Sequence, residues 1–111
     1  MNGERRRFPR YQFIATAEMT SEGSSLVIAA RLGDLSLHGC YLDMCNPPPS
    51  GTLITLRVVA GSTVFQSCSK VVYSHANLGA GVEFDNIEPQ DLTVLEGWIR
   101  EARTRDTVGT A

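Results

Sequence analysis

Four arginines near the start of the chain are its most concentrated source of ligand-binding chemistry. They are Arg5, Arg6, Arg7 and Arg10. A guanidinium group is planar and donates two parallel hydrogen bonds, which suits the O6 and N7 acceptors of guanine as well as phosphate oxygens. Because Pro9 lacks a backbone donor and pushes Phe8 out of helical geometry, we expect an extended or looped arm that can fold over a ligand. Taken alone, the same residues could form a solvated basic tail.

A second polar segment, residues 34–39, offers complementary chemistry. It contains Asp34, Ser36, His38 and Gly39. A carboxylate only accepts hydrogen bonds, so Asp34 suits the edge of guanine that carries N–H donors. Gly39 lets a backbone approach or turn where a side chain would clash. The two segments together predict a site for a guanine nucleotide. In the alternative interpretation, Asp34 and Ser36 bond to nearby backbone groups and cap a turn, and His38 faces solvent.

The distribution of charge limits the kind of ligand. The net charge of the chain is −2, but residues 1–10 carry +3 and the remaining residues carry −5. A cationic patch on an acidic body favours a small anionic ligand over a long nucleic acid, which would meet repulsion beyond the patch. We therefore expect no DNA partner.

We expect neither catalytic residues nor a metal site. The three cysteines are Cys40, Cys45 and Cys68. Their spacing does not suit a metal, and Cys40 and Cys68 fall in strand-like patterns that predict small core residues. The acid, hydroxyl and imidazole within residues 34–38 do not predict a hydrolytic triad, because residues two apart in a strand are separated by roughly 6.5 Å.

Short strands must position the two polar segments. Six stretches alternate apolar and polar residues with the period of two that is typical of a half-buried strand. They are residues 11–19, 26–36, 40–44, 54–58, 63–75 and 78–84. The second stretch carries Asp34 and Ser36 at its end, and paired apolar residues in the fifth indicate a bulge or burial on two faces. The pattern predicts a mainly β fold, a small six-stranded antiparallel β-barrel, in which closure removes exposed edges.

The periodicity changes after Phe84. Glu88 and Pro89 predict the start of a C-terminal α-helix, in which apolar residues recur at helical spacing. These residues are Leu92, Leu95, Trp98, Ile99 and Ala102. We expect this stripe to pack on the barrel, with a partner interface as the second interpretation. The predicted organisation is a flexible basic arm over 1–10, barrel and helix over 11–105, and a frayed tail over 106–111.

No stretch approaches the roughly 18 consecutive apolar residues that a membrane span needs. The N-terminus also lacks the apolar region of a secretory signal. We therefore expect a cytoplasmic protein without membrane insertion.

The two polar segments also resemble a known pair of motifs. The motifs are Arg6-x-x-x-Arg10 and Asp34-x-Ser36-x-x-Gly39. In this order they resemble the signature of the PilZ domain family, whose members bind the bacterial second messenger cyclic di-GMP. Residues 81–84, Gly-Val-Glu-Phe, resemble the last barrel strand of the family, so the resemblance covers nearly the whole chain.

The resemblance implies a split barrel that binds cyclic di-GMP and needs no other cofactor. Arg6 and Arg10 would contact guanine edges and phosphates, with Asp34 and Ser36 completing the polar contacts and Gly39 allowing close approach. Arg5, directly before the first motif, resembles family members in which two stacked ligand molecules bind.

The expected function is a sensor that closes its arm on the dinucleotide and signals to an unidentified effector protein, as a monomer or weak dimer. A degenerate PilZ-like adaptor that acts by protein contact without nucleotide is the alternative. A basic-armed nucleic-acid binder on an OB-like barrel is expected less, since the strands show few exposed aromatic residues for base stacking. An enzyme is expected least.

Overall fold

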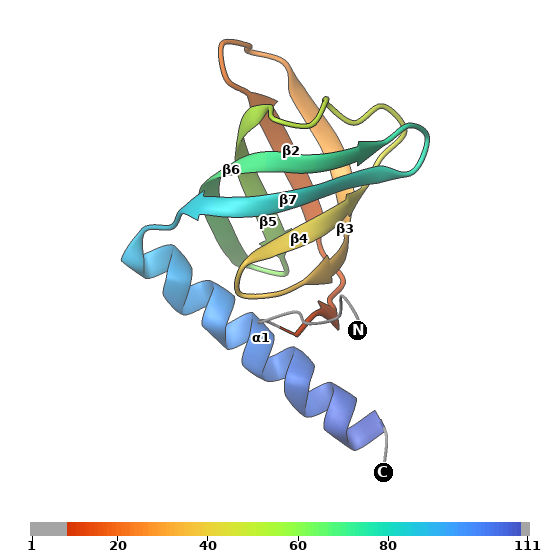
Figure 1. The fold of residues 1–111 in the computed structure, drawn as a ribbon. Helices are drawn as coiled ribbons and strands as arrows, with labels where there is room; N and C mark the ends of the chain where they lie inside the picture. Colours follow the sequence, from red (N-terminus) through yellow and green to blue (C-terminus); the bar gives the residue numbers. More distant parts are fainter. Residues whose placement is uncertain (1–8, 110–111) are drawn as a thin grey trace, which may run out of the picture.

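Six antiparallel strands close into a barrel, and one helix lies against one end of it (Figure 1). The computed structural model describes residues 9–109, with side-chain environments for residues 9–105. Around the barrel the strand order is β3, β2, β5, β6, β7, β4, and the pairing of β4 with β3 closes the ring. These strands are β2 (Thr16–Ser21), β3 (Val27–Leu35), β4 (Gly39–Asp43), β5 (Leu53–Ala60), β6 (Thr63–His75) and β7 (Gly79–Asn86). The predicted six-stranded antiparallel barrel is confirmed.

The first predicted strand is divided in two. The alternation over residues 11–19 predicts one strand, but the structure has a short β1 (Tyr11–Gln12) before β2. β1 pairs with the end of β3, whereas β2 lies between β3 and β5. Phe13 and Ala15, in the segment that joins β1 to β2, are both buried, so the alternation of buried side chains continues through the break. Periodicity therefore cannot reveal that the chain changes its pairing there.

The barrel interior is filled mainly by apolar side chains that alternate along each strand. Met19, Leu35 and Phe65 are among the largest side chains that are completely buried. The β6 strand also points two hydroxyl groups inward, at Ser67 and Ser69. Their Oγ atoms lie 2.7 Å apart, so each buried hydroxyl has a hydrogen-bond partner.

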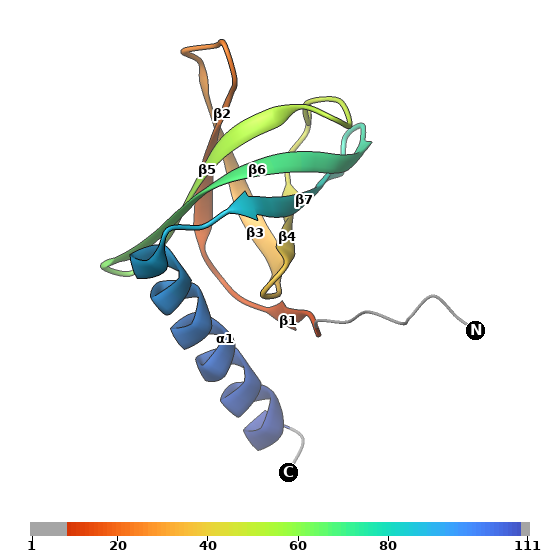
Figure 2. The same ribbon diagram turned by 60° about the vertical axis from the view of Figure 1, so that its left-hand side comes forward.

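The helix α1 (Pro89–Gly109) follows β7 almost directly and runs beneath the end of the barrel (Figure 2). Its start is tied to β6, because the Asp91 carboxylate accepts a hydrogen bond of 3.0 Å from the backbone N–H of Gln66. The apolar stripe packs on the barrel as predicted, except that Leu92 remains 38% exposed. Its buried members are Leu95, Trp98, Ile99 and Ala102. The helix also continues to Gly109, so residues 106–109 of the predicted tail are helical.

The structure corrects the predicted burial of Cys68 and the predicted start of the second strand at residue 26. Cys68 is exposed, because Ser67 and Ser69 occupy the inner positions on either side of it. Leu26 precedes β3 and is 68% exposed. The predicted irregularity of the fifth strand is confirmed at the Val71-Val72 pair, where the pairing of β6 with β7 shifts between Val71 and Tyr73. A second shift, between Cys68 and Ser69, was not predicted, and the Val64-Phe65 pair keeps a regular register with β5. Within the described range, no helix has both the length and the apolar content needed to span a bilayer.

Candidate functional site

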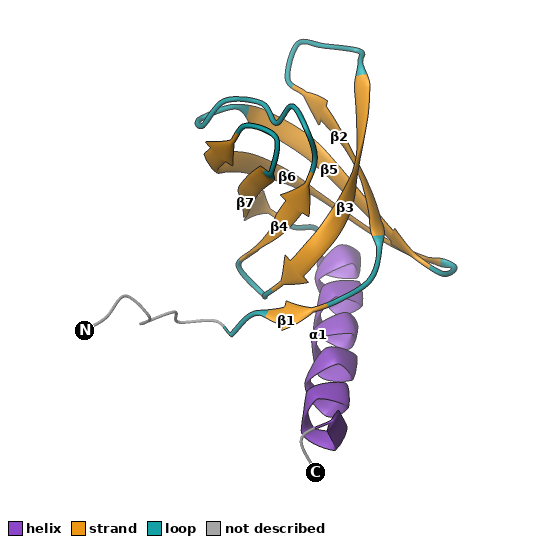
Figure 3. Ribbon diagram, turned by 90° about the vertical axis from the view of Figure 1, so that its right-hand side faces the viewer, coloured by secondary structure: helices purple, strands orange, loops and turns teal. Residues whose placement is uncertain are grey.

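The end of β3 and the turn into β4 bring most of the second polar segment to one place. Asp34 is the penultimate residue of β3, Ser36 begins the turn, and Gly39 opens β4. This turn lies beside β1 at the end of the barrel where α1 packs (Figure 3). The pairing of Gln12 with Asp34 places the chain that follows the arginine arm directly against the segment.

Arg10 and Asp34 face each other across this junction. The distance between Arg10 Nη1 and Asp34 Oδ2 is 3.9 Å, and the two side chains are 39% and 32% exposed. At this distance and exposure the ion pair contributes at most about 1 kcal/mol to folding. The second carboxylate oxygen, Asp34 Oδ1, is buried and has no hydrogen-bond partner among the described residues. Among the described residues, Asp34 therefore has an acceptor without a partner beside the guanidinium group of Arg10.

Ser36 organises the turn between β3 and β4. Its Oγ accepts hydrogen bonds from the backbone N–H groups of His38 at 3.0 Å and Gly39 at 3.1 Å. It also donates to the carbonyl of Gly39 at 3.2 Å, and its own N–H donates to the same carbonyl at 2.9 Å. The Ser36 side chain is 5% exposed. The hydroxyl is thus occupied by the turn, as the capping interpretation predicts.

Gly39 allows a close approach between strands. It pairs with Glu83, and a Cβ at this position would collide with the carbonyl oxygen of Val82. The prediction that Gly39 permits a close backbone approach is therefore confirmed for the neighbouring strand β7. Sequence reasoning missed the contact between His38 Nε2 and Glu83 Oε2, which are 2.7 Å apart. Residues 45 positions apart along the chain give no pattern that would reveal it.

Other predicted binding residues lie outside the described range. Arg5 and Arg6 precede residue 9, so only Arg10 of the predicted arginines can be assigned a position. Arg10 does lie beside Asp34, which joins the two predicted motifs.

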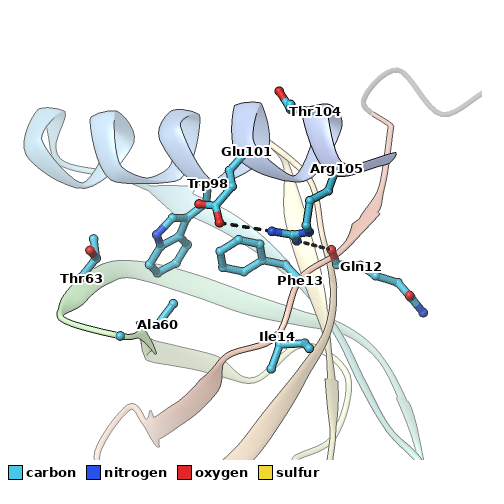
Figure 4. A pocket seen from close by; sticks show the side chains of 10 residues that line it. Gln12, Phe13, Ile14, Ala60, Thr63, Trp98, Glu101, Thr104 and Arg105 are labelled. Carbon is cyan, nitrogen blue, oxygen red and sulfur yellow. Dashed lines mark hydrogen bonds and ion pairs between the residues drawn. The ribbon is translucent and has the colours of Figure 1, made fainter. Parts of the chain in front are cut away.

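Gln12 and Phe13, which follow the basic arm of residues 1–10, also contact α1 (Figure 4). The sequence pattern does not predict this contact. The ring of Phe13 stacks on Trp98 with centroids 5.1 Å apart. Arg105 Nη2 lies 3.5 Å from the backbone oxygen of Gln12, to which it donates. These residues line a groove of about 970 Å³ between α1 and the barrel. The candidate site is therefore connected to α1 through β1.

Comparisons with known proteins agree with this fold. A family model described as "PilZ domain" matches residues 4–101. No curated protein sequence matches the chain significantly.

Solved structures share the fold at low sequence identity. The PilZ domain of YcgR from Escherichia coli, described with c-di-GMP, has a TM-score of 0.70 at 20% identity and covers 94% of this chain and 98% of that one. The PilZ domain of CeSA from a cellulose-synthesising bacterium has a TM-score of 0.65 at 16% identity, covering 88% and 98%. The Bacillus subtilis inhibitor of motility MotI/DgrA also has a TM-score of 0.65 at 16% identity, covering 88% of this chain and 51% of that one.

Proposed function

The chain belongs to the PilZ domain family, and we propose that it is a non-enzymatic receptor for cyclic di-GMP. The arginine arm closes on the dinucleotide over the β3–β4 turn and passes the signal to a partner protein. The fold it shares with a YcgR domain described with c-di-GMP supports the choice of ligand.

The observation that carries the proposal is the state of the Asp34 carboxylate. One oxygen faces Arg10 at 3.9 Å, and the other is buried without a hydrogen-bond partner among the described residues. A buried acceptor without a partner is costly, and a guanine edge supplies the N–H donors that would satisfy it. The Arg10 guanidinium makes no short hydrogen bond to Asp34. Its donors are therefore available to guanine or phosphate acceptors of a bound ligand.

The proposed site residues then have different roles. Arg6 and Arg10 bind guanine edges and phosphate oxygens, and Asp34 accepts from the opposite guanine edge. Ser36 and Gly39 act mainly through the turn, because the Ser36 hydroxyl is used by backbone groups and Gly39 meets β7. We assign Arg5 to a second, stacked ligand molecule, so the expected stoichiometry is two molecules per chain.

The signal would leave the site through β1 and α1. Contact of the ligand with the arm would act on the chain that leads into Phe13, which is stacked on Trp98 of α1. Gln12, which pairs with Asp34, is contacted by Arg105 of the same helix. The surface of α1 is therefore the face that we expect to differ between free and bound protein and to be recognised by the partner.

Calorimetric titration of the chain with cyclic di-GMP tests the proposal, with GTP and single-stranded DNA as control ligands. We expect selective binding of cyclic di-GMP. Arg6→Ala, Arg10→Ala and Asp34→Ala should each weaken it about 5- to 150-fold, since a bidentate base contact contributes about 1–3 kcal/mol. Arg10→Lys should weaken it as well, because an ammonium group cannot make the paired contact.

Stoichiometry and control ligands separate the alternatives. Arg5→Ala should reduce the number of bound molecules from two to one without unfolding the protein. Equal affinity for single-stranded DNA would indicate a nucleic-acid binder. Absence of binding to the folded chain would instead favour the adaptor that works by protein contact alone.

A further inference from the structure

The first half of strand β3 has a neighbouring strand on one side only, among residues 9–109. Residues 27–30 pair with β2, whereas the pairing of β3 with β4 starts at Arg31, opposite Asp43. After Asp43 the chain leaves β3, and the N–H of Met44 donates instead to the carbonyl of Leu78, in the turn before β7. The open edge belongs to the hairpin of β2 and β3, which projects beyond the rest of the barrel (Figure 2).

The backbone groups of Val27 and Ala29 point toward this open edge. The N–H of Leu32 donates to the carbonyl of Ala15, which lies on the β2 side of the strand. Because hydrogen-bonded and non-hydrogen-bonded positions alternate along an antiparallel strand, Val27 and Ala29 direct their N–H and C=O groups away from β2. The described part of the chain provides no strand to meet them there. The edge therefore offers two donors and two acceptors to another extended strand.

This edge lacks the features by which exposed strands usually avoid pairing with another chain. Protected edges commonly carry lysine, proline or a bulge. Residues 24–30 contain no charged residue, proline or glycine, and their pairing with β2 is regular. Leu26 and Val27 are also 68% and 56% exposed. A regular, uncharged and apolar edge of this kind is a template for a further strand.

A second copy of the chain fits this edge in the antiparallel direction. A two-fold axis sets the segment against itself, so the donors of each chain meet acceptors of the other without opposing charges inside the segment. The flanking charges have opposite signs, with Glu22 before the segment and Arg31 after it. Antiparallel pairing directs Glu22 of one chain toward Arg31 of the other. Because Asp43 already lies opposite Arg31 within each chain, the backbone bonds and apolar contacts supply most of the attraction.

We propose that two copies of the chain form a weak homodimer in which the β3 edges at residues 25–30 pair antiparallel across a two-fold axis. The inference goes beyond the proposed function, since the pairing involves no residue of the candidate site and no ligand. The segment is short compared with the interfaces of permanent dimers, so we expect a reversible dimer that forms at high protein concentration.

The test is analytical ultracentrifugation of the full chain without ligand, from about 10 μM to about 1 mM, the range in which a small interface associates. A dimer should appear as the concentration rises. Ala29→Pro removes one outward N–H from each chain and leaves the β2 ladder intact, so it should raise the dimer Kd about 5- to 150-fold. Val27→Lys should weaken the dimer as well, because like charges then meet across the axis.

The control variant is Ile14→Lys, which places the same charge at an apolar side chain that is 91% exposed but lies away from this edge. It should change the dimer Kd less than about twofold. Thermal unfolding of each variant checks that the barrel is retained. A dimer that Ile14→Lys dissociates and Val27→Lys does not would overturn the proposal.

Hydrogen exchange on the unsubstituted chain tests the interface without any substitution. The amides of Val27 and Ala29 should exchange more slowly as the concentration rises. The amide of Ile28 is the internal control, because it already bonds to β2 and should not change. A chain that stays monomeric at the highest concentration, or a dimer that leaves the Val27 and Ala29 amides unprotected, contradicts the proposal. No ligand is present in these experiments, so their outcome is independent of cyclic di-GMP binding.

Discussion

The guanidinium of Arg105 lies over the ring of Phe13, with 5.7 Å between Cζ and the ring centroid (Figure 4). Arg105 is on α1, and Phe13 directly follows β1, so this contact fastens the helix to the start of the barrel. The same side chain donates to the Gln12 carbonyl and pairs with Glu101 at 3.2 Å. Arg105 of α1 therefore contacts the backbone of Gln12, the residue that pairs with Asp34.

Replacing Arg105 should loosen this attachment. Arg105→Ala removes a cation–π contact worth about 0.5–1 kcal/mol at an exposed site, together with an i,i+4 pair worth about 0.3–0.5 kcal/mol. We expect the free energy of unfolding in urea to fall by about 1 kcal/mol. Arg100→Ala is the control, since the Arg100 guanidinium has no ion pair among residues 9–105. Equal losses in both variants would contradict the proposed fastening.

The turn between β3 and β4 should depend on the Ser36 hydroxyl. In Ser36→Ala the N–H groups of His38 and Gly39 lose their acceptor, which should lower the free energy of unfolding by about 1–3 kcal/mol. Hydrogen exchange at these two amides should accelerate as well.

The control for this turn is Ser24→Ala. Ser24 accepts a bond of the same type from the Leu26 N–H at 3.0 Å, but in an exposed loop. There we expect a change within about 0.5 kcal/mol, because water replaces the lost acceptor. Equal destabilisation by the two substitutions would show that burial of the turn is unimportant.

Two glycines should respond in opposite directions to replacement by alanine. A methyl group at Gly39 meets the backbone of Val82, which cannot move without separating β4 from β7, so we expect a loss of about 1–3 kcal/mol or more. At Gly97 in α1 the new carbon would meet no atom within 4 Å apart from its chain neighbours and the local helix backbone. Gly97→Ala should therefore stabilise the protein by about 0.5–1 kcal/mol through helix propensity. Thermal unfolding of the two variants measures both signs, and stabilisation by Gly39→Ala would contradict the close approach.

The three cysteines should differ in reactivity toward thiol reagents. Burial, and to a smaller extent the charge of Asp34, strongly raise the pKa of the Cys40 thiol, whereas Cys45 and Cys68 are exposed. Only the thiolate reacts, so two thiols should be labelled in the native protein and the third only after unfolding. Raising the pH toward 9 should still leave Cys40 unlabelled, because its pKa is raised by burial. Mass spectrometry of labelled peptides identifies the sites, and rapid native labelling of Cys40 would argue against its burial.

Much of the barrel could be predicted because its inner face is apolar in strict alternation. The apolar–polar alternation gives a wrong prediction where polar side chains point into the barrel. Ser67 and Ser69 form a hydrogen bond with each other in the interior, so Cys68 between them lies on the outer face and not in the predicted core. The break between β1 and β2 was missed for another reason. Phe13 and Ala15 keep the alternation while the chain changes its pairing on β3.

The sequence predicts which residues belong to the candidate site better than it predicts what each of them does. The types and spacing of Arg10 and Asp34 indicated that they act together, and the structure brings them together. The sequence could not distinguish a hydroxyl that contacts ligand from one that closes a turn, because Ser36 suits both.

Phe13 is fixed between Trp98 and Arg105, and this anchor separates two kinds of selection along the chain. Tyr11 packs against the hydrophobic core just before this anchor, whereas Pro9 and Arg10 are exposed and can change at little cost to folding. The side chains after Phe13 that point into the barrel have no such freedom, because they fill its core.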